Sequence, residues 1–499
     1  MRRFICHLAV FIASLMHVLD VHSRSDDGKV LAGKYCQSCH VQPLPEHLDK
    51  PTWVAKVFPI MRKYLGLDQL PQRETLPHDL AAFYPTFPAM SEDEWFAVAQ
   101  WYIDNAPSVL PQPAPVKVEG ITERFESIPI VRDVQMPMTT LVKFDVVRKN
   151  LIIGDGMGNA LFVTDLAGKA ISRIALSGPP SCVEVRPDAW YVTDMGRLLP
   201  HDSAIGSLLQ VTWVRDSPMI SILIDSLRRP VHVVVADMNA DGRNDYLICE
   251  YGNLIGRFGW YEISSNGKKK YHSLAPVPGA IRAVLRDING DGKLDIIVQM
   301  AQAREGLFAY MNKGKGRYVA KELLVLPPSF GSSSFEFADA NGDGIDDIVV
   351  TTGDNGDYDT PPLKPYHGVY VFTARKDGSF RQEFFQHLDG AYGAKIRDFD
   401  GNGTKDMLSF SYFPRLDRGD YDLLRYDSGV MTSSVTSWRV ANAEIGRWLV
   451  SDVADVDGDG DDDMLIGNVS IGPGTVPEET TRTWMNNGVV ALYLRNTTK

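Results

Sequence analysis

The sequence predicts a mainly β fold, a seven-bladed β-propeller, preceded by a small all-α domain. Three observations support this prediction. Five acidic nonapeptides recur with first residues 50, 52, 59 and 57 positions apart, beginning at Asp237. Short β-branched runs such as Ile296–Val298 follow several of them, as expected when a loop joins two strands. A cysteine motif and a proline-rich stretch precede the repeats.

The composition excludes three classes of protein. A chain of 499 residues with 44% hydrophobic residues is too apolar to be disordered, and its net charge of -12 argues against nucleic-acid binding. Its apolar runs are shorter than the roughly 18 residues of a membrane span. We therefore expect no nucleic-acid partner, no transmembrane domain in the mature chain, and at least two domains.

Residues 1–23 have the pattern of an export signal peptide. Arg2 and Arg3 form a positive end, an apolar stretch continues to Leu19, and small residues at Val21–Ser23 offer a cleavage site. An uncleaved anchor is the alternative, although this stretch is shorter than the roughly 20 residues that a span needs. The expected location is the bacterial periplasm, the cell surface or the medium.

Cys36-Gln37-Ser38-Cys39-His40 has the C-x-x-C-H spacing that attaches a c-type haem. The spacing places Cys36 and Cys39 along one edge of the porphyrin and brings His40 to the iron. The alternative is a chance match or half of a zinc site, but a second C-x-x-C is missing from the sequence. Residues 24–106 are expected to form a cytochrome c-like domain, with one helix over 26–35 and another that Ser91 and Glu94 cap.

The second axial ligand of the haem iron is open among three residues. Small cytochromes c carry a Met-Pro step before the last helix, and here Tyr84 precedes the proline. Met61 is the favoured ligand, because it follows Pro59 closely, while Met90 and His47 are the alternatives. The commoner role of a methionine is core packing.

Prolines at positions 107, 111, 113 and 115 predict a stiff extended linker over residues 107–138. The propeller is then expected over residues 139–499. Residues 150–165 and 189–194 have the pattern of two blades without an acidic nonapeptide.

The acidic nonapeptides are candidate calcium loops. Side-chain oxygens at positions one, three, five and nine and a backbone carbonyl at position seven suit a hard cation, and a glycine at position six allows the sharp turn. The five sets are Asp237, Asn239, Asp241, Arg243 and Asp245; Asp287, Asn289, Asp291, Lys293 and Asp295; Asp339, Asn341, Asp343, Ile345 and Asp347; Asp398, Asp400, Asn402, Thr404 and Asp406; and Asp455, Asp457, Asp459, Asp461 and Asp463.

A helical calcium sensor is disfavoured, because an EF-hand needs a glutamate at position twelve. Here that position holds Ile248, Val298, Val350, Ser409 and Ile466. The five loops alone carry more net negative charge than the whole chain, so the acidity indicates metal sites and not a cationic partner.

The repeats resemble FG-GAP or VCBS repeats, the calcium-looped blades that also occur in integrin α-subunit propellers. Together with the C-x-x-C-H motif they resemble bacterial VCBS-repeat proteins that carry a cytochrome c module. Three segments are similar to recurrent sequence motifs of that group: Thr352–Asn355, Lys364–Gly368 and Gly446–Trp448. The resemblance implies the fold, haem c and calcium, but no particular reaction.

Two functions from different classes stay open. In the favoured one the protein is an electron carrier whose propeller docks a redox partner protein, a carbohydrate or a cell-surface polymer. In the other the propeller oxidises a sugar or alcohol and passes the electrons to the haem. Residues near predicted strand ends could then line a catalytic face: His201, Asp202, His232, Arg282, Tyr366, His367, Lys395, Arg397, Arg447 and Trp448.

The remaining cysteines, Cys182 and Cys249, allow two states. They could pair as one disulfide in an oxidising compartment, or stay as two separately buried thiols.

Overall fold

The computed structural model describes residues 27–68, 81, 84–215, 217–302, 304–418, 423–474 and 476–498. The predicted export signal lies outside these residues. The chain forms two compact units, each treated by itself below. One contains the residues up to Gln112 with Pro327–Ser329 and Pro362–Lys364, and the other contains Pro113–Leu326, Phe330–Pro361 and Pro365–Lys499. In the described part of the chain, every helix is too short or too polar to span a bilayer.

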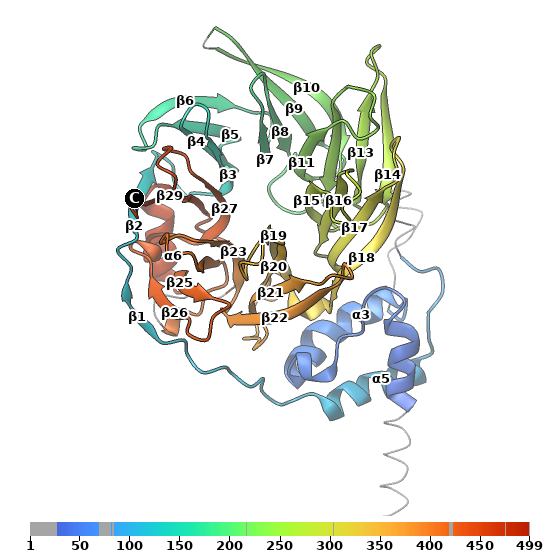
Figure 1. The fold of residues 1–499 in the computed structure, drawn as a ribbon. Coiled ribbons are helices and arrows are strands. Elements are labelled where there is room, and N and C mark those ends of the chain that lie inside the picture. Colours follow the sequence, from blue (N-terminus) through green and yellow to red (C-terminus); the bar gives the residue numbers. More distant parts are fainter. Residues whose placement is uncertain are drawn as a thin grey trace, which may run out of the picture. The chain divides into compact units, whose positions relative to one another are not determined.

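The first unit is helical in its described parts (Figure 1). Residues 27–36 form a helix, and further turns and helices are η1 (Pro45–His47), α2 (Lys50–Thr52), the π-helical η2 (Trp53–Val57), α3 (Phe58–Tyr64) and α5 (Glu92–Asn105). The predicted cap of α5 is confirmed: the Ser91 side chain accepts the Glu94 N–H, and the Glu94 side chain accepts the Ser91 N–H.

The helical core depends on aromatic residues. Trp53 and Tyr102 lie with ring centroids 4.4 Å apart, and Trp95 and Trp101 are buried beside them. Gly28 marks a close helix crossing, because a Cβ there would lie 2.3 Å from the Ala97 carbonyl oxygen. The helix over 27–36 therefore packs directly on α5.

The second unit is a seven-bladed β-propeller, which confirms the predicted β architecture. Blade 1 comprises β3 (Thr139–Asp145), β4 (Asn150–Asp155), β5 (Ala160–Thr164) and β6 (Ala170–Ala175), and blade 2 comprises β7 (Pro180–Val185), β8 (Trp190–Asp194), β9 (Gly206–Val214) and β10 (Ser217–Leu227). Blade 3 comprises β11 (Pro230–Ala236), β12 (Asp245–Glu250), β13 (Arg257–Ile263) and β14 (Lys269–Ala275). Blade 4 comprises β15 (Ala280–Arg286), β16 (Asp295–Met300), β17 (Glu305–Asn312) and β18 (Tyr318–Leu326).

The other three blades follow the same plan. Blade 5 comprises β19 (Ser332–Ala338), β20 (Asp347–Thr352), β21 (Gly368–Ala374) and β22 (Phe380–His387), and blade 6 comprises β23 (Ala391–Arg397), β24 (Lys405–Ser411), β25 (Leu424–Val430) and β26 (Thr436–Arg439). Blade 7 comprises β27 (Trp448–Ala454), β28 (Asp463–Asn468) and β29 (Val489–Asn496), with α6 (Glu478–Asn486) between the last two strands. The first strands of the blades surround the propeller axis (Figure 1).

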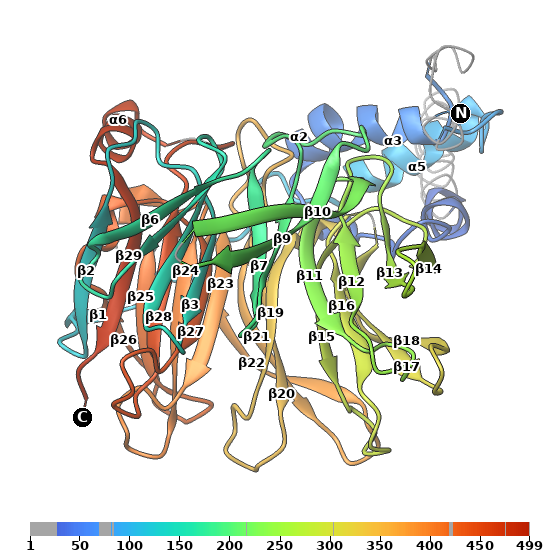
Figure 2. The ribbon, with the colours of Figure 1, turned by 90° about the horizontal axis from the view of Figure 1, so that it is seen from above.

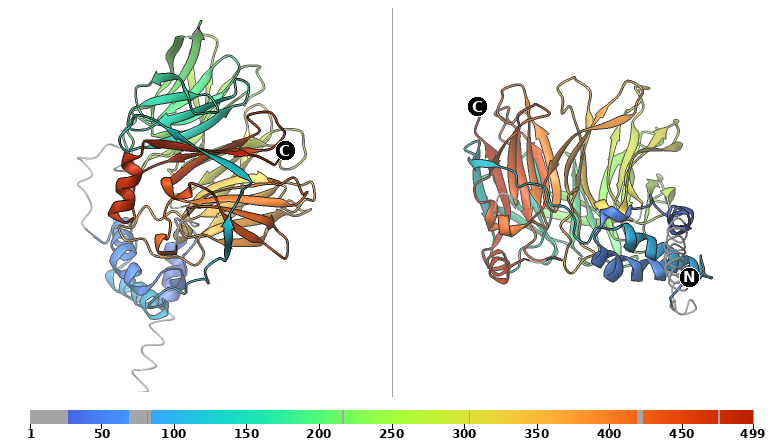
Figure 3. Two further views of the ribbon diagram at one scale, coloured as in Figure 1. Left: turned by 90° about the vertical axis from the view of Figure 1, so that its left-hand side faces the viewer. Right: turned by 90° about the horizontal axis from the view of Figure 1, so that it is seen from below.

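The structure differs from the linker expected over residues 107–138. Two strands lie within that segment, β1 (Val118–Ile121) and β2 (Phe125–Val131). β2 pairs antiparallel with β29 as the outer strand of blade 7, and β1 pairs parallel with β26 of blade 6. Figure 3 shows these cyan strands beside the red C-terminal ones. Prolines 107, 111, 113 and 115 precede both strands, so the extended segment is shorter than expected.

Neighbouring strands of each blade are antiparallel, so the propeller has two distinct sides (Figure 2). The acidic loops join first and second strands on one side, which we call the acidic-loop side. The connections between blades lie on the other, the inter-blade side. There, one backbone hydrogen bond recurs in all seven blades and joins the residue before the first strand to a residue after the second. The pairs are Met138 and Gly156, Pro179 and Met195, Arg229 and Tyr251, Gly279 and Ala301, Gly331 and Gly353, Gly390 and Tyr412, and Arg447 and Val469.

Hydroxyl groups join some blades to the next. The Thr140 hydroxyl donates to the Pro180 carbonyl oxygen at 2.5 Å, and the Ser181 hydroxyl donates to that of Pro230 at 2.9 Å. The Ser333 hydroxyl donates to the carbonyl oxygen of Ala391 at 2.8 Å. Each donor is the second residue of a first strand, so the bond depends on a Ser or Thr at that repeat position.

Candidate functional site

The five acidic loops connect the first and second strands of blades 3 to 7. In each loop the aspartate at position one accepts the N–H of the glycine at position six, as Asp237 does from Gly242 at 2.7 Å. The same bond forms in the other four loops. Each glycine has a positive φ, between 80° and 93°, where a residue with a side chain is disfavoured. The shared turn keeps the position-one carboxylates on equivalent sites.

The aspartate at position nine is buried in all five loops. In blade 7, Asp463 accepts the N–H of Val456 within its own loop, the N–H of Asn496 at 2.8 Å and the Tyr493 hydroxyl at 3.1 Å. Asp295, Asp347 and Asp406 likewise accept an N–H from the end of the third strand of their blades. Position nine therefore joins the loop to the blade.

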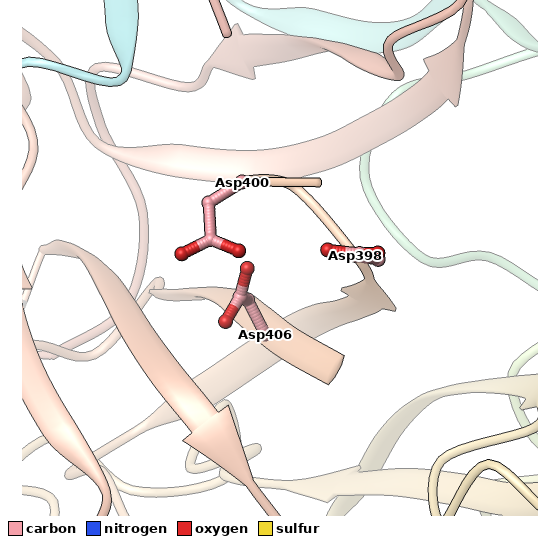
Figure 4. A group of neighbouring side chains, drawn as sticks. All are labelled: Asp398, Asp400 and Asp406. Carbon is pink, nitrogen blue, oxygen red and sulfur yellow. The ribbon is translucent and has the colours of Figure 1, made fainter. Parts of the chain in front are cut away.

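Carboxylate oxygens converge in the loops of blades 6 and 7. One oxygen each from Asp398, Asp400 and Asp406 lies within 4.8 Å of the others, and Figure 4 shows these three carboxylates around a common centre. Asp455, Asp457 and Asp459 converge in the same way. Such a set of oxygen donors fits a hard cation like calcium.

The pKa values of the buried aspartates also indicate a cation site. Burial, and then the nearby Asp457, raise the pKa of Asp463 to about 7. Burial together with Asp241 and Asp237 raises the pKa of Asp245 to about 6. Clustered carboxylates repel one another, and a bound cation would relieve that repulsion.

Blades 1 and 2 close the same turn without an acidic loop. In blade 1, Asp145 is buried and accepts two bonds from Arg148, one from Nη1 at 2.8 Å and one from the backbone N–H at 3.1 Å. Lys149 donates to the carbonyl oxygen of Asp457 in the acidic loop of blade 7. In blade 2, a short turn is closed by the Arg186 N–H and the Ala189 carbonyl oxygen.

The C-x-x-C-H residues lie at the end of the helix over 27–36. Cys36 ends that helix and is half-buried, and burial raises the pKa of its thiol to about 11. Cys39 is exposed. Nδ1 of His40 donates to the Val41 carbonyl oxygen at 2.9 Å, which fixes the proton on Nδ1 and leaves Nε2 as the basic nitrogen. A histidine oriented in this way suits metal ligation through Nε2.

The candidates for the second axial ligand are all described. Met61 lies on α3 and is partly buried against the cluster around Trp53, which also contains Met90 and contacts Cys36. Met90 is 4% exposed. Nδ1 of His47 accepts the Leu44 N–H at 3.2 Å, and burial lowers the pKa of this imidazole. Met61 and Met90 thus share one apolar cluster with Cys36, whereas a backbone contact engages His47.

The residues named for a catalytic face do not form one site. Trp448 is fully buried, and its Nε1 donates to the Ala443 carbonyl oxygen. Glu336 pairs with Lys395 at 3.5 Å and with Arg397 at 3.3 Å.

Arg282 lies close enough to His232 and Lys395 to act on both, whereas several other members of that set have separate surroundings. Asp202 accepts the N–H groups of Leu254 and Ile255, so it joins two loops. His201 contacts the carbonyl oxygen of Met195, Tyr366 stacks on Phe330 with centroids 4.4 Å apart, and His367 is buried. His232 and Arg282 hold the same register position in neighbouring first strands, and Arg447 lies on the inter-blade side.

Cys182 and Cys249 are free thiols in the structure. Cys182 lies on β7 and Cys249 on β12, and burial raises the pKa of both. The structure therefore has the two-thiol state and not the disulfide.

Sequence reasoning missed three residues on the inter-blade side: Arg229, Tyr251 and Tyr392. Each lies outside every motif, and only the closure of the ring brings them together. The one available signal is the repeat register, in which Arg229 stands where Gly279, Gly331 and Gly390 stand in other blades.

Comparisons with known proteins identify the repeats. Residues 237–298 and 287–350 match the FG-GAP-like repeat family. Over 140 residues the chain is 32% identical to a T-cell immunomodulatory protein homolog of Plasmodium falciparum, covering 24% of this chain and 19% of that protein. Over 142 residues it is 28% identical to integrin alpha-4 of Xenopus laevis, covering 24% of this chain and 13% of the integrin. The chain thus spans less than a fifth of either relative.

Solved propellers are similar at low sequence identity. The calcium-binding protein regucalcin of Agrobacterium tumefaciens is 10% identical, with a TM-score of 0.41 over 77% of this chain and 96% of that one. A putative gluconolactonase is 12% identical, with a TM-score of 0.34 over 58% of this chain and 90% of that one.

Proposed function

We propose that this chain of FG-GAP-like repeats is an extracytoplasmic c-type haem protein that carries electrons, and that its β-propeller is a calcium-stabilised platform for docking or ligand binding. The observation that carries the proposal is the environment of His40. Its Nδ1 donates to the Val41 carbonyl oxygen, so Nε2 is free to bind a metal one residue after the C-x-x-C cysteines.

The residues that would hold the haem are Cys36, Cys39 and His40, with Met61 as the favoured second axial ligand. Haem iron supplies one-electron redox chemistry. Cys39 is exposed and Cys36 half-buried, so the two thiols lie at the border of the helical core. Trp53, Trp95 and Met90 form an apolar wall that excludes water from that border.

The residues that would hold calcium are positions one, three, five, seven and nine of the five acidic loops. Their role is structural, because in four of the five loops position nine also joins the loop to a later strand of its blade through a backbone hydrogen bond. Loops of extracellular modules bind calcium at about 10⁻⁴ to 10⁻³ M, which suits a compartment outside the cytoplasm. The proposed partners are a redox protein and a carbohydrate or cell-surface polymer.

The reading of the propeller as a sugar or alcohol oxidase has less support. Of the residues proposed for its catalytic face, Trp448 is a core residue, and Lys395 and Arg397 share an ion pair with Glu336. A shared ion pair on two first strands stabilises the ring and offers no free base.

The test of the haem assignment is export of the full chain from a host that attaches haem c. We expect covalent haem in the purified protein, seen as reversible absorbance bands and as added mass after denaturation. Cys36→Ala with Cys39→Ala should abolish covalent attachment, and Cys182→Ala is the matched control that should retain it. Haem-free wild-type protein would refute the assignment.

The second axial ligand has its own test. Met61→Ala should remove the near-infrared sulfur-to-iron band of the oxidised protein, while Met90→Leu should keep it. A band that persists in Met61→Ala would assign the ligand elsewhere.

A further inference from the structure

The inter-blade side carries an arrangement of side chains that neither the calcium loops nor the haem motif uses. Seven equivalent backbone hydrogen bonds encircle the axis there, and five of the seven residues before the first strands are methionine, proline or glycine. In blade 3 this residue is Arg229, and in blade 7 it is Arg447. Two blades thus place a guanidinium where the ring otherwise has Met, Pro or Gly.

Arg229 occupies a backbone conformation that favours glycine. Its φ is +49°, and the equivalent residues Gly279, Gly331 and Gly390 have φ of +101°, +64° and +62°. An arginine here is disfavoured by its own side chain, and such an outlier points to a functional role. The structure therefore has a cationic side chain at a position whose backbone conformation favours glycine.

Aromatic rings accompany both arginines. The Arg229 guanidinium lies 5.5 Å from the Tyr251 ring centroid, and that of Arg447 lies 3.9 Å from the Tyr412 ring centroid. The rings of Tyr412 and Tyr392 lie with centroids 5.3 Å apart. Tyr251 and Tyr392 are partly buried, so each residue keeps some accessible surface.

The two groups face each other across the axis. In a ring of seven, blades 6 and 7 lie opposite blade 3, and Figure 1 shows β11 across from β23 and β27. The groups are close enough to act on each other, because Tyr251 and Asp354 of blade 5 both raise the pKa of Tyr392 beyond the effect of burial. Side chains from four blades thus converge over the axis.

Both guanidinium groups lack a carboxylate partner among the residues that the structure describes. Arg229 Nη2 donates to the Leu198 carbonyl oxygen at 3.2 Å, while its Nε is buried without a hydrogen bond. Arg447 is 2% exposed, and its Nε donates to the Tyr412 carbonyl oxygen at 2.7 Å. A buried cation that only carbonyl oxygens compensate favours a ligand that brings negative charge.

We propose that Arg229, Tyr251, Tyr392 and Arg447 bind a carboxylated sugar, of the hexuronic acid class, over the propeller axis on the inter-blade side. The arginines attract the carboxylate, and the partly buried tyrosines contact the C–H face of the sugar ring. An anion without a sugar ring, such as acetate or phosphate, makes the arginine contacts alone. This combination separates a sugar acid from both a neutral sugar and an inorganic anion.

The experiment is calorimetric titration of the full calcium-loaded chain with sodium glucuronate, glucose and sodium acetate. We expect saturable binding of glucuronate that is about ten- to a hundredfold tighter than that of glucose, which lacks the charge-assisted hydrogen bond, or of acetate, which lacks the contacts with the tyrosine rings. Glucose or acetate within threefold of glucuronate, or the absence of glucuronate binding, would overturn the proposal.

Variants locate the site. Arg229→Gln and Tyr392→Leu should each weaken glucuronate binding by about tenfold or more, and Arg229→Lys should lose less than Arg229→Gln. The matched control is Arg375→Gln, an exposed guanidinium paired with Glu383 on the acidic-loop side. If Arg229→Gln does not fold, the Tyr392→Leu and Arg229→Lys pair decides. Binding unchanged in the variants that fold would contradict the assignment.

This inference names a ligand for the platform of the proposed function and does not depend on the haem. Absorbance bands recorded on the same samples report the haem independently. A protein with haem bands and no glucuronate affinity overturns the inference alone, and one with affinity but no haem overturns the electron-carrier proposal alone.

Discussion

Blades 3 to 7 and blades 1 and 2 have the same strand order but close the turn between their first two strands differently. In blades 3 to 7 a nine-residue acidic loop joins these strands, and in blades 6 and 7 it places three carboxylates around one centre. In blade 1 one buried carboxylate, Asp145, is neutralised by Arg148 three residues later. The comparison teaches that a buried aspartate at this turn needs a positive charge, and that either a side chain or a bound cation can supply it.

The largest expected effect is removal of calcium. With calcium about tenfold above its dissociation constant, each loop gains about 1.4 kcal/mol, so five independent loops lose about 7 kcal/mol on chelation. We expect a large fall in the melting temperature in EDTA, restored by calcium. Hydrogen exchange should increase in the turns of blades 3 to 7 and stay unchanged at Asp145–Asn150. An unchanged melting temperature would show that bound calcium does not stabilise the loops of blades 3 to 7.

A smaller effect is expected from Asp463→Ala in the loop of blade 7. The substitution leaves the buried N–H of Asn496 and the Tyr493 hydroxyl without their acceptor and removes a proposed calcium ligand. We expect a loss of about 3 kcal/mol in calcium and a smaller loss in EDTA, measured by denaturant unfolding. Asp462→Ala, at the neighbouring position that the ligand pattern omits, is the control. Equal losses in calcium and EDTA would show that Asp463 only braces the blade.

In blade 1 the loss of stability should not depend on calcium. Arg148→Met removes the partner of a buried carboxylate, and we expect a loss of about 2 kcal/mol that is the same with and without calcium. Arg173→Met, at an exposed position of the outer strand β6 of the same blade, should cost less. A calcium-dependent loss at Arg148 would mean that blade 1 also takes part in metal binding.

The last prediction concerns the protonation of His232, which distinguishes acid unfolding from loss of metal. Burial, and then Arg282 and Lys143, lower the pKa of His232 from 6.5 to about 3. The folded protein binds this proton less tightly than the unfolded chain, so stability falls as the pH drops from about 6.5 towards 3. His232→Gln should reduce that fall by up to about 1.4 kcal/mol per pH unit in EDTA. Identical pH profiles for the variant and the parent would contradict the assignment.

Much of the propeller could be predicted from local patterns. The turn residues, the metal-ligand spacing and the apolar run after each loop lie within a dozen positions, so the five loops and the β architecture were readable. β1 and β2 were not, because their pairing with β26 and β29 depends on strands at the far end of the chain. Arg229, Tyr251 and Tyr392 were missed for the same reason, since they come from two blades that lie on opposite sides of the axis.

The C-x-x-C-H spacing identified the candidate haem-binding residues, but it did not predict how the His40 ring is oriented. The orientation comes from the Val41 carbonyl oxygen, a backbone group that a residue pattern does not encode. Cys182 and Cys249 show the converse: two cysteines that spacing allows to pair lie on strands of different blades.

The outer strand of blade 7 is synthesised before the first strand of blade 1 and long before the rest of its own blade. Phe125–Val131 emerges early, whereas its partner Val489–Asn496 is among the last residues of the chain. Until then blade 7 cannot form, and β2 is an unpaired edge that another strand could capture. Blades can thus fold one after another during synthesis, but the ring closes only when the last strand has been made. A chain that enters another compartment before that point would still be open and able to be translocated. A chain that starts at Thr139 would expose the edge of β29 permanently and should associate with copies of itself.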